Sequence, residues 1–299
     1  MTLYSEHEIL KKAEEGGYGV GAFFPLSADW IKPIFQAAEE EHSPLIITNT
    51  PELAYDLGIG LYSSTLMKAA HEASVPVAFH MDHGFTTDEK TLGHIMHFIK
   101  NDWNSVMYDA SMRSLEDNIR ETSRIVEICH AGDVAVLGAV GIVPRDVGEV
   151  QGYSVPEELL TKPEAAKKFV RETKVDSLAI SIGQYVHPLT LGEPRPVQKT
   201  AKLNFELLKR IRESVDVHLV LHGGTHVPDE AICQAIKLGI SEIKVAALLA
   251  IVWADALREY LNENPDDTMT PNILGPALSA VKNMTVEYMK LFGSSGNAW

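Results

Sequence analysis

Short apolar runs rich in β-branched residues alternate along this chain with longer segments whose apolar positions recur at helical spacing. Most of the short runs are continuously apolar, as expected for strands of a parallel sheet that is covered on both faces. The candidate strands are residues 19–24, 44–49, 75–82, 105–109, 134–140, 177–182, 217–222 and 242–246. Eight strand and helix units in series predict an α/β fold, a (β/α)8 TIM barrel.

Helix-capping residues stand at the start of several helical segments. In each, a side chain that can accept hydrogen bonds from free backbone amides is followed three residues later by an acid: Ser5 with Glu8, Thr86 with Glu89, and Ser114 with Asp117. One more helical segment, 274–291, follows the eight units. We therefore expect a single barrel domain over residues 1–299 with an extra C-terminal helix in an extension of about 270–299.

Two connections are longer than is usual between neighbouring elements. They span residues 142–160, after the fifth strand, and 187–200, after the sixth. In a (β/α)8 barrel the loops that follow strands lie on the catalytic face. Both connections are therefore candidate active-site lids.

Composition and charge restrict the class of protein. Hydrophobic residues make up 45% of the chain, enough for a sizeable core, and 41 acidic against 26 basic residues give a formal net charge of −15. Such a charge repels phosphate backbones and anionic lipids, so we expect neither nucleic acid nor membrane as partner. Cys129 and Cys233 are too few for a disulfide scaffold, and the first residues lack the basic and apolar regions of a secretion signal. We expect a cytoplasmic protein.

Potential metal ligands stand at the carboxyl ends of several candidate strands. His83 follows the third, His187 the sixth, and His222 ends the seventh. Because these ends ring the active site of a barrel, the three histidines suit a zinc-type divalent ion that keeps a coordination position for substrate. The chain has 12 histidines, so the alternative for any single one is a hydrogen-bonded structural role.

Two carboxylates and a further histidine lie beside the proposed ligands. Asp82 directly precedes His83, and strand alternation would point the two side chains apart unless the chain leaves regular strand geometry there. If it does, Asp82 can act as a general acid and base, the alternative being a loop or capping carboxylate. Asp109 could orient a histidine ligand, bind a second metal position, or be structural. His80 could stack under the site or be a structural barrel histidine.

The last two strands carry candidate substrate-binding residues. Gly223, Gly224 and Thr225 follow the seventh strand, where many barrels bind phosphate through backbone amides and a hydroxyl, although a tight turn would also explain the glycines. Lys244 interrupts the apolar eighth strand. It could point into the barrel mouth to bind substrate, or extend its charge to solvent from the strand end.

At these residues the sequence resembles the class II, metal-dependent ketose-bisphosphate aldolases, especially their tagatose-bisphosphate branch, from about residue 4 to about 264. The matching strings are 75–84 (VPVAFHMDHG), 105–111 (SVMYDAS), 175–183 (VDSLAISIG) and 219–225 (LVLHGGT). The resemblance implies that His83, His187 and His222 hold Zn²⁺ or another divalent metal and that Asp82 shuttles the proton of the substrate C4 hydroxyl. It also implies that Gly183, Gly223 and Thr225 help bind the donor phosphate, and it allows a monovalent cation beside them.

The chain also departs from this family. Ala139 stands where the family has a glutamate, and Phe24 where it usually has an asparagine. The stretch of the eighth strand from Lys244 to Ala247 contains neither residue of the family's Asn-x-x-Thr. These departures suggest a donor half other than dihydroxyacetone phosphate, with Lys244 or Arg145 binding another anionic group.

Our leading hypothesis is a class II aldolase, a lyase that cleaves or forms the C3–C4 bond of a ketose or modified ketose. A divalent cation would stabilise the enediolate left by cleavage, so no lysine Schiff base is needed. The alternatives are a metal-dependent sugar epimerase and a non-catalytic aldolase-like subunit. The expected partners are a small-molecule sugar or sugar phosphate and further copies of the chain, in a homodimer or homotetramer.

Overall fold

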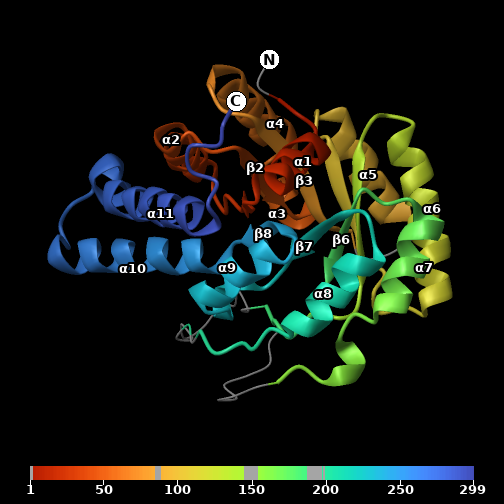
Figure 1. Ribbon diagram of the computed structural model, residues 1–299. Coiled ribbons are helices and arrows are strands. Elements are labelled where there is room, and N and C mark those ends of the chain that lie inside the picture. The colour runs from red at the N-terminus through yellow and green to blue at the C-terminus, as the bar shows by residue number, and fades with distance from the viewer. Residues whose placement is uncertain (1–2, 85–88, 145–153, 187–196, 198) are drawn as a thin grey trace.

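In a computed structural model, eight parallel strands close into a barrel in chain order, which confirms the predicted fold. The structure describes residues 3–299 except 85–88, 145–153, 187–196 and 198, which are drawn as a thin grey trace in Figure 1. The strands are β1 (Val20–Phe23), β2 (Leu45–Asn49), β3 (Val77–Gly84), β4 (Ser105–Tyr108), β5 (Ala135–Val140), β6 (Ser177–Ile180), β7 (His218–Leu221) and β8 (Ile240–Val245).

Helices surround the barrel on the outside (Figure 1). They are α1 (Glu6–Gly16), α2 (Ile31–Glu41), α3 (Pro51–Asp56), α4 (Ile59–Glu72), α5 (Glu89–Lys100), α6 (Leu115–His130), α7 (Pro163–Thr173), α8 (Phe205–Ser214), α9 (Asp229–Lys237), α10 (Ala247–Glu263) and α11 (Thr270–Phe292), with short 3-10 turns η1 (Ala28–Trp30), η2 (Glu157–Leu159) and η3 (Gly224–His226). The outward side chains of the strands pack under these helices in one large apolar cluster.

Two of the predicted helix caps are present. Ser5 Oγ accepts from the Glu8 amide at 3.2 Å while the Glu8 carboxylate accepts from the Ser5 amide at 2.9 Å, a complete capping box. Ser114 Oγ likewise accepts from the Asp117 amide, also at 3.2 Å. The third predicted cap, Thr86, lies outside the described residues.

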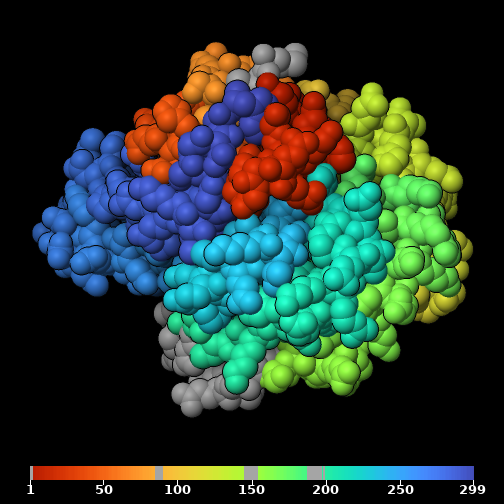
Figure 2. Space-filling view, in the orientation of Figure 1, coloured from red at the N-terminus to blue at the C-terminus, as the bar shows by residue number. Residues whose placement is uncertain are grey.

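Helix α1 closes the amino-terminal end of the barrel. It contacts β1, β3, β7 and β8, and its buried Ile9 and Leu10 pack in one cluster with the inward-facing Ala22 and Ile46 of β1 and β2. Figure 2 shows α1, in red, on this face beside the dark blue C-terminal segment. Solvent is therefore excluded from this end, and the opposite end, where the strands terminate, remains for chemistry.

The C-terminal part contains the one extra helix that the sequence predicts, because α10 follows β8 as the eighth helix of the barrel and α11 comes after it. The predicted segment 274–291 lies within α11, which packs against α10 and α2. In Figure 1 the blue hairpin of α10 and α11 extends away from the barrel. Only Ala247 and Leu249 of α10 are buried, although the helix is rich in apolar residues. No helix in the described part of the chain is both long and apolar enough to span a membrane.

Candidate active site

An irregularity at the end of β3 brings Asp82 and His83 to the same site. The pairing register between β3 and β4 shifts between Met81 and Gly84. His83 has a φ of 50°, in the left-handed region that residues other than glycine seldom adopt. The strict alternation of strand side chains is therefore broken at this point. This is the condition stated above for Asp82 and His83 to face the same site. Asp82 Oδ2 lies 3.4 Å from His83 Nε2.

Asp109 lies past the end of β4 and holds the other nitrogen of His83. Its Oδ2 is 3.5 Å from His83 Nδ1, and its Oδ1 accepts from the Ser111 amide at 3.0 Å. Burial alone would raise the pKa of Asp109, but the hydrogen bond and charge of His83 lower it to about 2. Asp109 is therefore an anion that can orient the imidazole of His83, the first of the roles considered for it.

His222 follows β7 and faces His83 across the site. The two ring centroids are 4.9 Å apart, nearly edge to face. Burial lowers the pKa of His222 to about 3, so its imidazole is neutral near pH 7 and can offer a lone pair. Its buried Nε2 has no hydrogen-bond partner among the described residues. A buried nitrogen without a partner is costly in a protein interior, and a metal ion would satisfy it.

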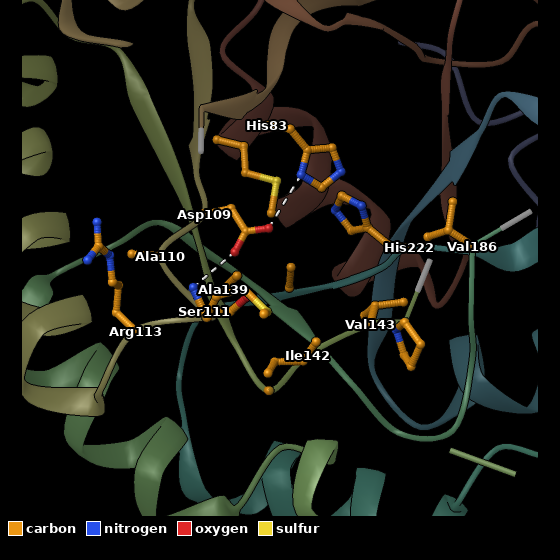
Figure 3. A pocket seen from close by; sticks show the side chains of 15 residues that line it. His83, Asp109, Ala110, Ser111, Arg113, Ala139, Ile142, Val143, Val186 and His222 are labelled. Atoms are coloured by element: carbon orange, nitrogen blue, oxygen red, sulfur yellow. Dashed lines mark hydrogen bonds and ion pairs between the residues drawn. The ribbon is translucent and has the colours of Figure 1, made fainter. Parts of the chain in front are cut away.

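Asp82, His83 and His222 form a group that fits a divalent metal. Their potential ligand atoms all lie within 4.8 Å of one another. Two imidazoles and a carboxylate are ligands that zinc accepts. Figure 3 shows the His83 and His222 rings close together. One oxygen of the Asp109 carboxylate points to His83 and the other to Ser111. The predicted third ligand, His187, lies outside the described residues, as do residues 145–153 of the first candidate lid and most of the second.

The glycines predicted to bind substrate occupy positions that exclude a side chain. Gly183 has a φ of 118°, and a Cβ built on it would lie 2.2 Å from the Lys202 carbonyl oxygen. Gly223 has a φ of 70°, and its Cβ would lie 2.5 Å from the Tyr185 carbonyl oxygen. At both positions the backbone approaches so closely that only glycine fits.

The loop after β7 combines opposite backbone conformations. Gly223 is left-handed and Gly224 begins the right-handed turn η3, a combination that directs successive amides to one side. Thr225 follows within this turn and is buried. The loop can therefore cradle an anion, as its sequence predicted.

The structure directs Lys244 into the barrel, which is the first of the two placements considered for it. Its Nζ lies 2.7 Å from Glu242 Oε1 and 3.6 Å from Asp82 Oδ1, and the residue is only 7% exposed. The interpretation of a lysine that extends to solvent is wrong, because β8 directs this side chain into the barrel. Its charge is shared with two acids of the chain, although it also lines a cavity beside the site.

Glu6 and Glu242 were missed in the sequence and lie in the same buried network. Glu6 Oε2 is 2.6 Å from Nδ1 of His80, whose Nε2 is 3.7 Å from Asp82 Oδ1. His80 is thus a buried, hydrogen-bonded barrel histidine, the second of the two interpretations considered for it. Glu242 could have been found, since it precedes Lys244 by two residues and strand alternation gives both the same face. Glu6 carried no signal, because as the first residue of α1 it reads as an ordinary helix-start acid.

Two cavities adjoin at His83, Val186 and His222. The larger has a volume of about 620 Å³ and the smaller about 300 Å³. Residues that line the larger cavity include Met107, Asp109, Ser111, Arg113, Ala139 and Ile142, some of them labelled in Figure 3. Residues that line the smaller cavity include Phe24, Leu26, Leu53, Gly223, Thr225 and Ala246.

Comparison with known proteins identifies the family. Residues 4–297 match the family model described as fructose-bisphosphate aldolase class-II. The chain belongs to the class II fructose-bisphosphate aldolase family. The protein is accordingly an enzyme of the lyase class, and the resemblance seen in the strand-end motifs is confirmed over nearly the whole chain.

Individual members of this family align with the chain from end to end. A fructose-bisphosphate aldolase of Geobacillus stearothermophilus is 36% identical over 301 aligned residues, covering 100% of this chain and 99% of that protein. The D-tagatose-1,6-bisphosphate aldolase subunit GatY of Klebsiella oxytoca is 34% identical, with 99% of both chains covered. Among solved structures, the YdjI aldolase of Escherichia coli K12 superposes with a TM-score of 0.80 at 30% identity, covering 99% of this chain and 100% of that one.

Proposed function

We propose that this protein is a divalent-metal-dependent aldolase that cleaves or forms the C3–C4 bond of a ketose or modified ketose. The observation that carries the proposal is the convergence of Asp82, His83 and His222, with potential ligand atoms within 4.8 Å of one another. Family membership supports the same reaction class. Zn²⁺ is the favoured ion, and His187 is proposed as its third imidazole ligand.

In this proposal His83 and His222 hold the ion, and Asp109 fixes the orientation of the His83 ring. Each of the two histidines comes from a different strand end, so the barrel sets their separation before any ligand binds. When bound, the cation supplies positive charge that stabilises negative charge on the donor half as the carbon–carbon bond breaks. The protein's part is to keep both imidazoles neutral and oriented, which burial does for His222.

Asp82 is proposed to take the proton from the C4 hydroxyl in cleavage and to return it in condensation. It is buried, and although burial raises the pKa of its carboxyl, His83 and Lys244 hold that pKa well below its usual range. The group is therefore ionised and can accept a proton before substrate arrives. It also lines the smaller cavity beside His83 and His222.

The two cavities are proposed to bind the two halves of the substrate. The smaller one contains Gly223 and Thr225, so it is assigned to the donor half, with Gly183 and Gly224 completing the loop environment. The larger one is assigned to the acceptor aldehyde. Phe24, Leu26 and Leu53 make the described donor cavity more apolar than a phosphorylated triose alone requires. The substrate panel must therefore contain ketoses with and without a C1 phosphate.

The test is a retro-aldol assay on that panel, with metal-free protein reconstituted with Zn²⁺, Mn²⁺ or Co²⁺. The expected result is metal-dependent release of an aldehyde, trapped by a coupled dehydrogenase, and its loss in His83→Ala and Asp82→Ala. His42→Ala is the matched control, because that histidine is exposed and lies at the end of α2. Full activity of His83→Ala or Asp82→Ala would refute the proposal, and stereochemical inversion without aldehyde release would favour the epimerase.

We also propose that copies of the chain associate through the hairpin of α10 and α11. The support is the apolar character of α10, whose Ile251, Val252 and Trp253 are only half-buried in the isolated chain. A partner surface would cover them. Sedimentation at several protein concentrations is expected to show a dimer or tetramer, and a monomer at every concentration would contradict this proposal.

A further inference from the structure

Five ionisable side chains lie in contact inside the barrel, below the proposed metal site. They form a ring that runs from α1 through β3 to β8, which a side-chain hydrogen bond between Glu242 and Glu6 closes: Glu6, His80, Asp82, Lys244 and Glu242. Each is at most 7% exposed. Barrel interiors are normally filled with apolar side chains, as the layer of Met107, Leu137 and Val220 is here. Buried charges destabilise a fold unless they are paired, so a ring of this kind requires an explanation in function.

One side of the ring connects the closed end of the barrel to the site. Glu6 projects from the first turn of α1, and its Oε2 lies 2.6 Å from His80 Nδ1. Ser105 Oγ lies 2.8 Å from the same nitrogen. The other imidazole nitrogen of His80, Nε2, lies 3.7 Å from Asp82 Oδ1. Fixing Nδ1 therefore fixes the direction in which Nε2 faces Asp82.

The other side of the ring reaches the same oxygen of Asp82. Lys244 Nζ lies 3.6 Å from Asp82 Oδ1 and is held from behind by Glu242 at 2.7 Å. Two cationic or donor groups thus converge on Oδ1, while Oδ2 faces His83. The two oxygens of one carboxylate consequently have different surroundings.

We propose that Glu6 and Glu242 are positioning residues for the Asp82 carboxylate, Glu6 acting through His80 and Glu242 through Lys244. They hold Oδ1 in the barrel interior so that Oδ2 lies beside His83, at the junction of the two cavities where the C4 hydroxyl would bind. The inference rests on the proposed function, because it assigns a purpose to the orientation of the proposed proton acceptor. It also makes α1, at the opposite end of the barrel, part of the catalytic apparatus.

Glu6 allows the clearest test, because it touches neither cavity and can influence Asp82 only through the ring. Glu6→Gln keeps the shape of the side chain but removes the charge that accepts the His80 Nδ1 proton. The result expected is a kcat for cleavage at least about tenfold lower, with KM and bound metal within about twofold of wild type. Glu14→Gln is the matched control. It lies on the same helix and loses ion pairs with His218 and Arg212, outside the ring.

A partial reaction separates positioning from general damage. The donor released from the active ketose is incubated in D₂O with the enzyme, and exchange of its carbon-bound hydrogen is followed by NMR. This exchange does not involve the C4 hydroxyl, so Glu6→Gln is expected to retain it within about twofold while cleavage falls. A parallel fall of exchange and cleavage, or an equal loss in Glu14→Gln, would show a structural effect and overturn the inference.

A milder variant covers the case in which Glu6→Gln does not fold. Ser105→Ala removes the second partner of His80 Nδ1 and is expected to lower kcat in the same selective way, by about two- to fivefold. Unchanged kcat in Ser105→Ala, or in a folded Glu6→Gln, would overturn the inference while leaving the proposed function intact. Absence of cleavage by the wild-type enzyme over the whole panel would overturn both.

Discussion

Replacing Gly223 by alanine tests whether the backbone beside the metal site is as closely packed as the structure shows. An alanine at a φ of 70° costs roughly 1–2 kcal/mol for its left-handed conformation. Its Cβ would also lie 2.5 Å from the Tyr185 carbonyl oxygen, whereas ordinary contact begins at 3.4 Å. The loop must therefore move by about 0.9 Å. This movement would occur directly after His222, the proposed metal ligand.

Gly17→Ala isolates this clash from the conformational cost. Gly17 has a nearly identical φ of 69°, and a Cβ built there meets nothing within 4 Å. Both variants are expected to lose the roughly 1–2 kcal/mol of unfolding free energy that an alanine in the left-handed conformation costs. Gly223→Ala is expected to lose roughly 1–3 kcal/mol more because of overpacking, and its kcat/KM should fall by up to ~100-fold, since displacements near 1 Å have such effects.

Urea unfolding and steady-state retro-aldol kinetics measure the two effects separately. Gly17→Ala should retain wild-type kinetics in spite of its lower stability. If Gly223→Ala matched Gly17→Ala in stability and wild type in kcat/KM, the close approach of Tyr185 would be refuted. The assignment of the loop after β7 to substrate binding would be refuted with it.

Two further predictions concern the charged groups of the site. Asp109→Asn should weaken metal binding by about 10- to 100-fold, because the anion that orients His83 is lost, and competition with a chelating dye measures this; an unchanged affinity would contradict the role given to Asp109. Burial opposes the charged form of His80, but the Glu6 carboxylate outweighs burial and raises the pKa of His80 from 6.5 to about 8. The stabilisation from this ion pair is therefore complete below pH 6.5, the pKa in the unfolded chain, and is lost as pH rises through 8. That contribution is roughly 2 kcal/mol. Between pH 6 and pH 9, wild type should therefore lose about that much more unfolding free energy than Glu6→Gln, and parallel pH profiles of the two proteins would contradict the pairing.

The fold was predictable because the strand signal is unusually direct. Every strand of a closed parallel barrel is covered on both faces, so most of the strands appear in the sequence as continuous apolar runs. Every predicted strand boundary lies within two residues of the observed one. Two of the differences have physical causes: β3 continues to Gly84 through the irregularity at His83, and β8 begins earlier, at Ile240, where it still pairs with β7.

The residues of the proposed metal site were predictable for a related reason. His83 and His222 each end an apolar run, and a polar residue there has few explanations in a barrel. The surroundings of Asp82 were only partly predictable. Strand alternation places His80, two residues earlier on β3, on the same face as Asp82. The contact of Asp82 with Lys244 depends on which strands lie opposite each other across the closed barrel, and the contact of Glu6 with His80 depends on how α1 folds back over the end. Such contacts join residues far apart in sequence, and local patterns do not encode them.

The measurement that tests the central claim most directly is calorimetric titration of metal-free protein with Zn²⁺, comparing wild type with His222→Ala. The account predicts about one tight site per chain in the wild type. It predicts a Zn²⁺ affinity at least about 100-fold lower in the variant, because alanine removes His222 Nε2, a buried nitrogen that has no other partner among the described residues. Equal Zn²⁺ affinity in the two proteins, or no binding by the wild type, would contradict the claim that this barrel holds a catalytic metal between β3 and β7.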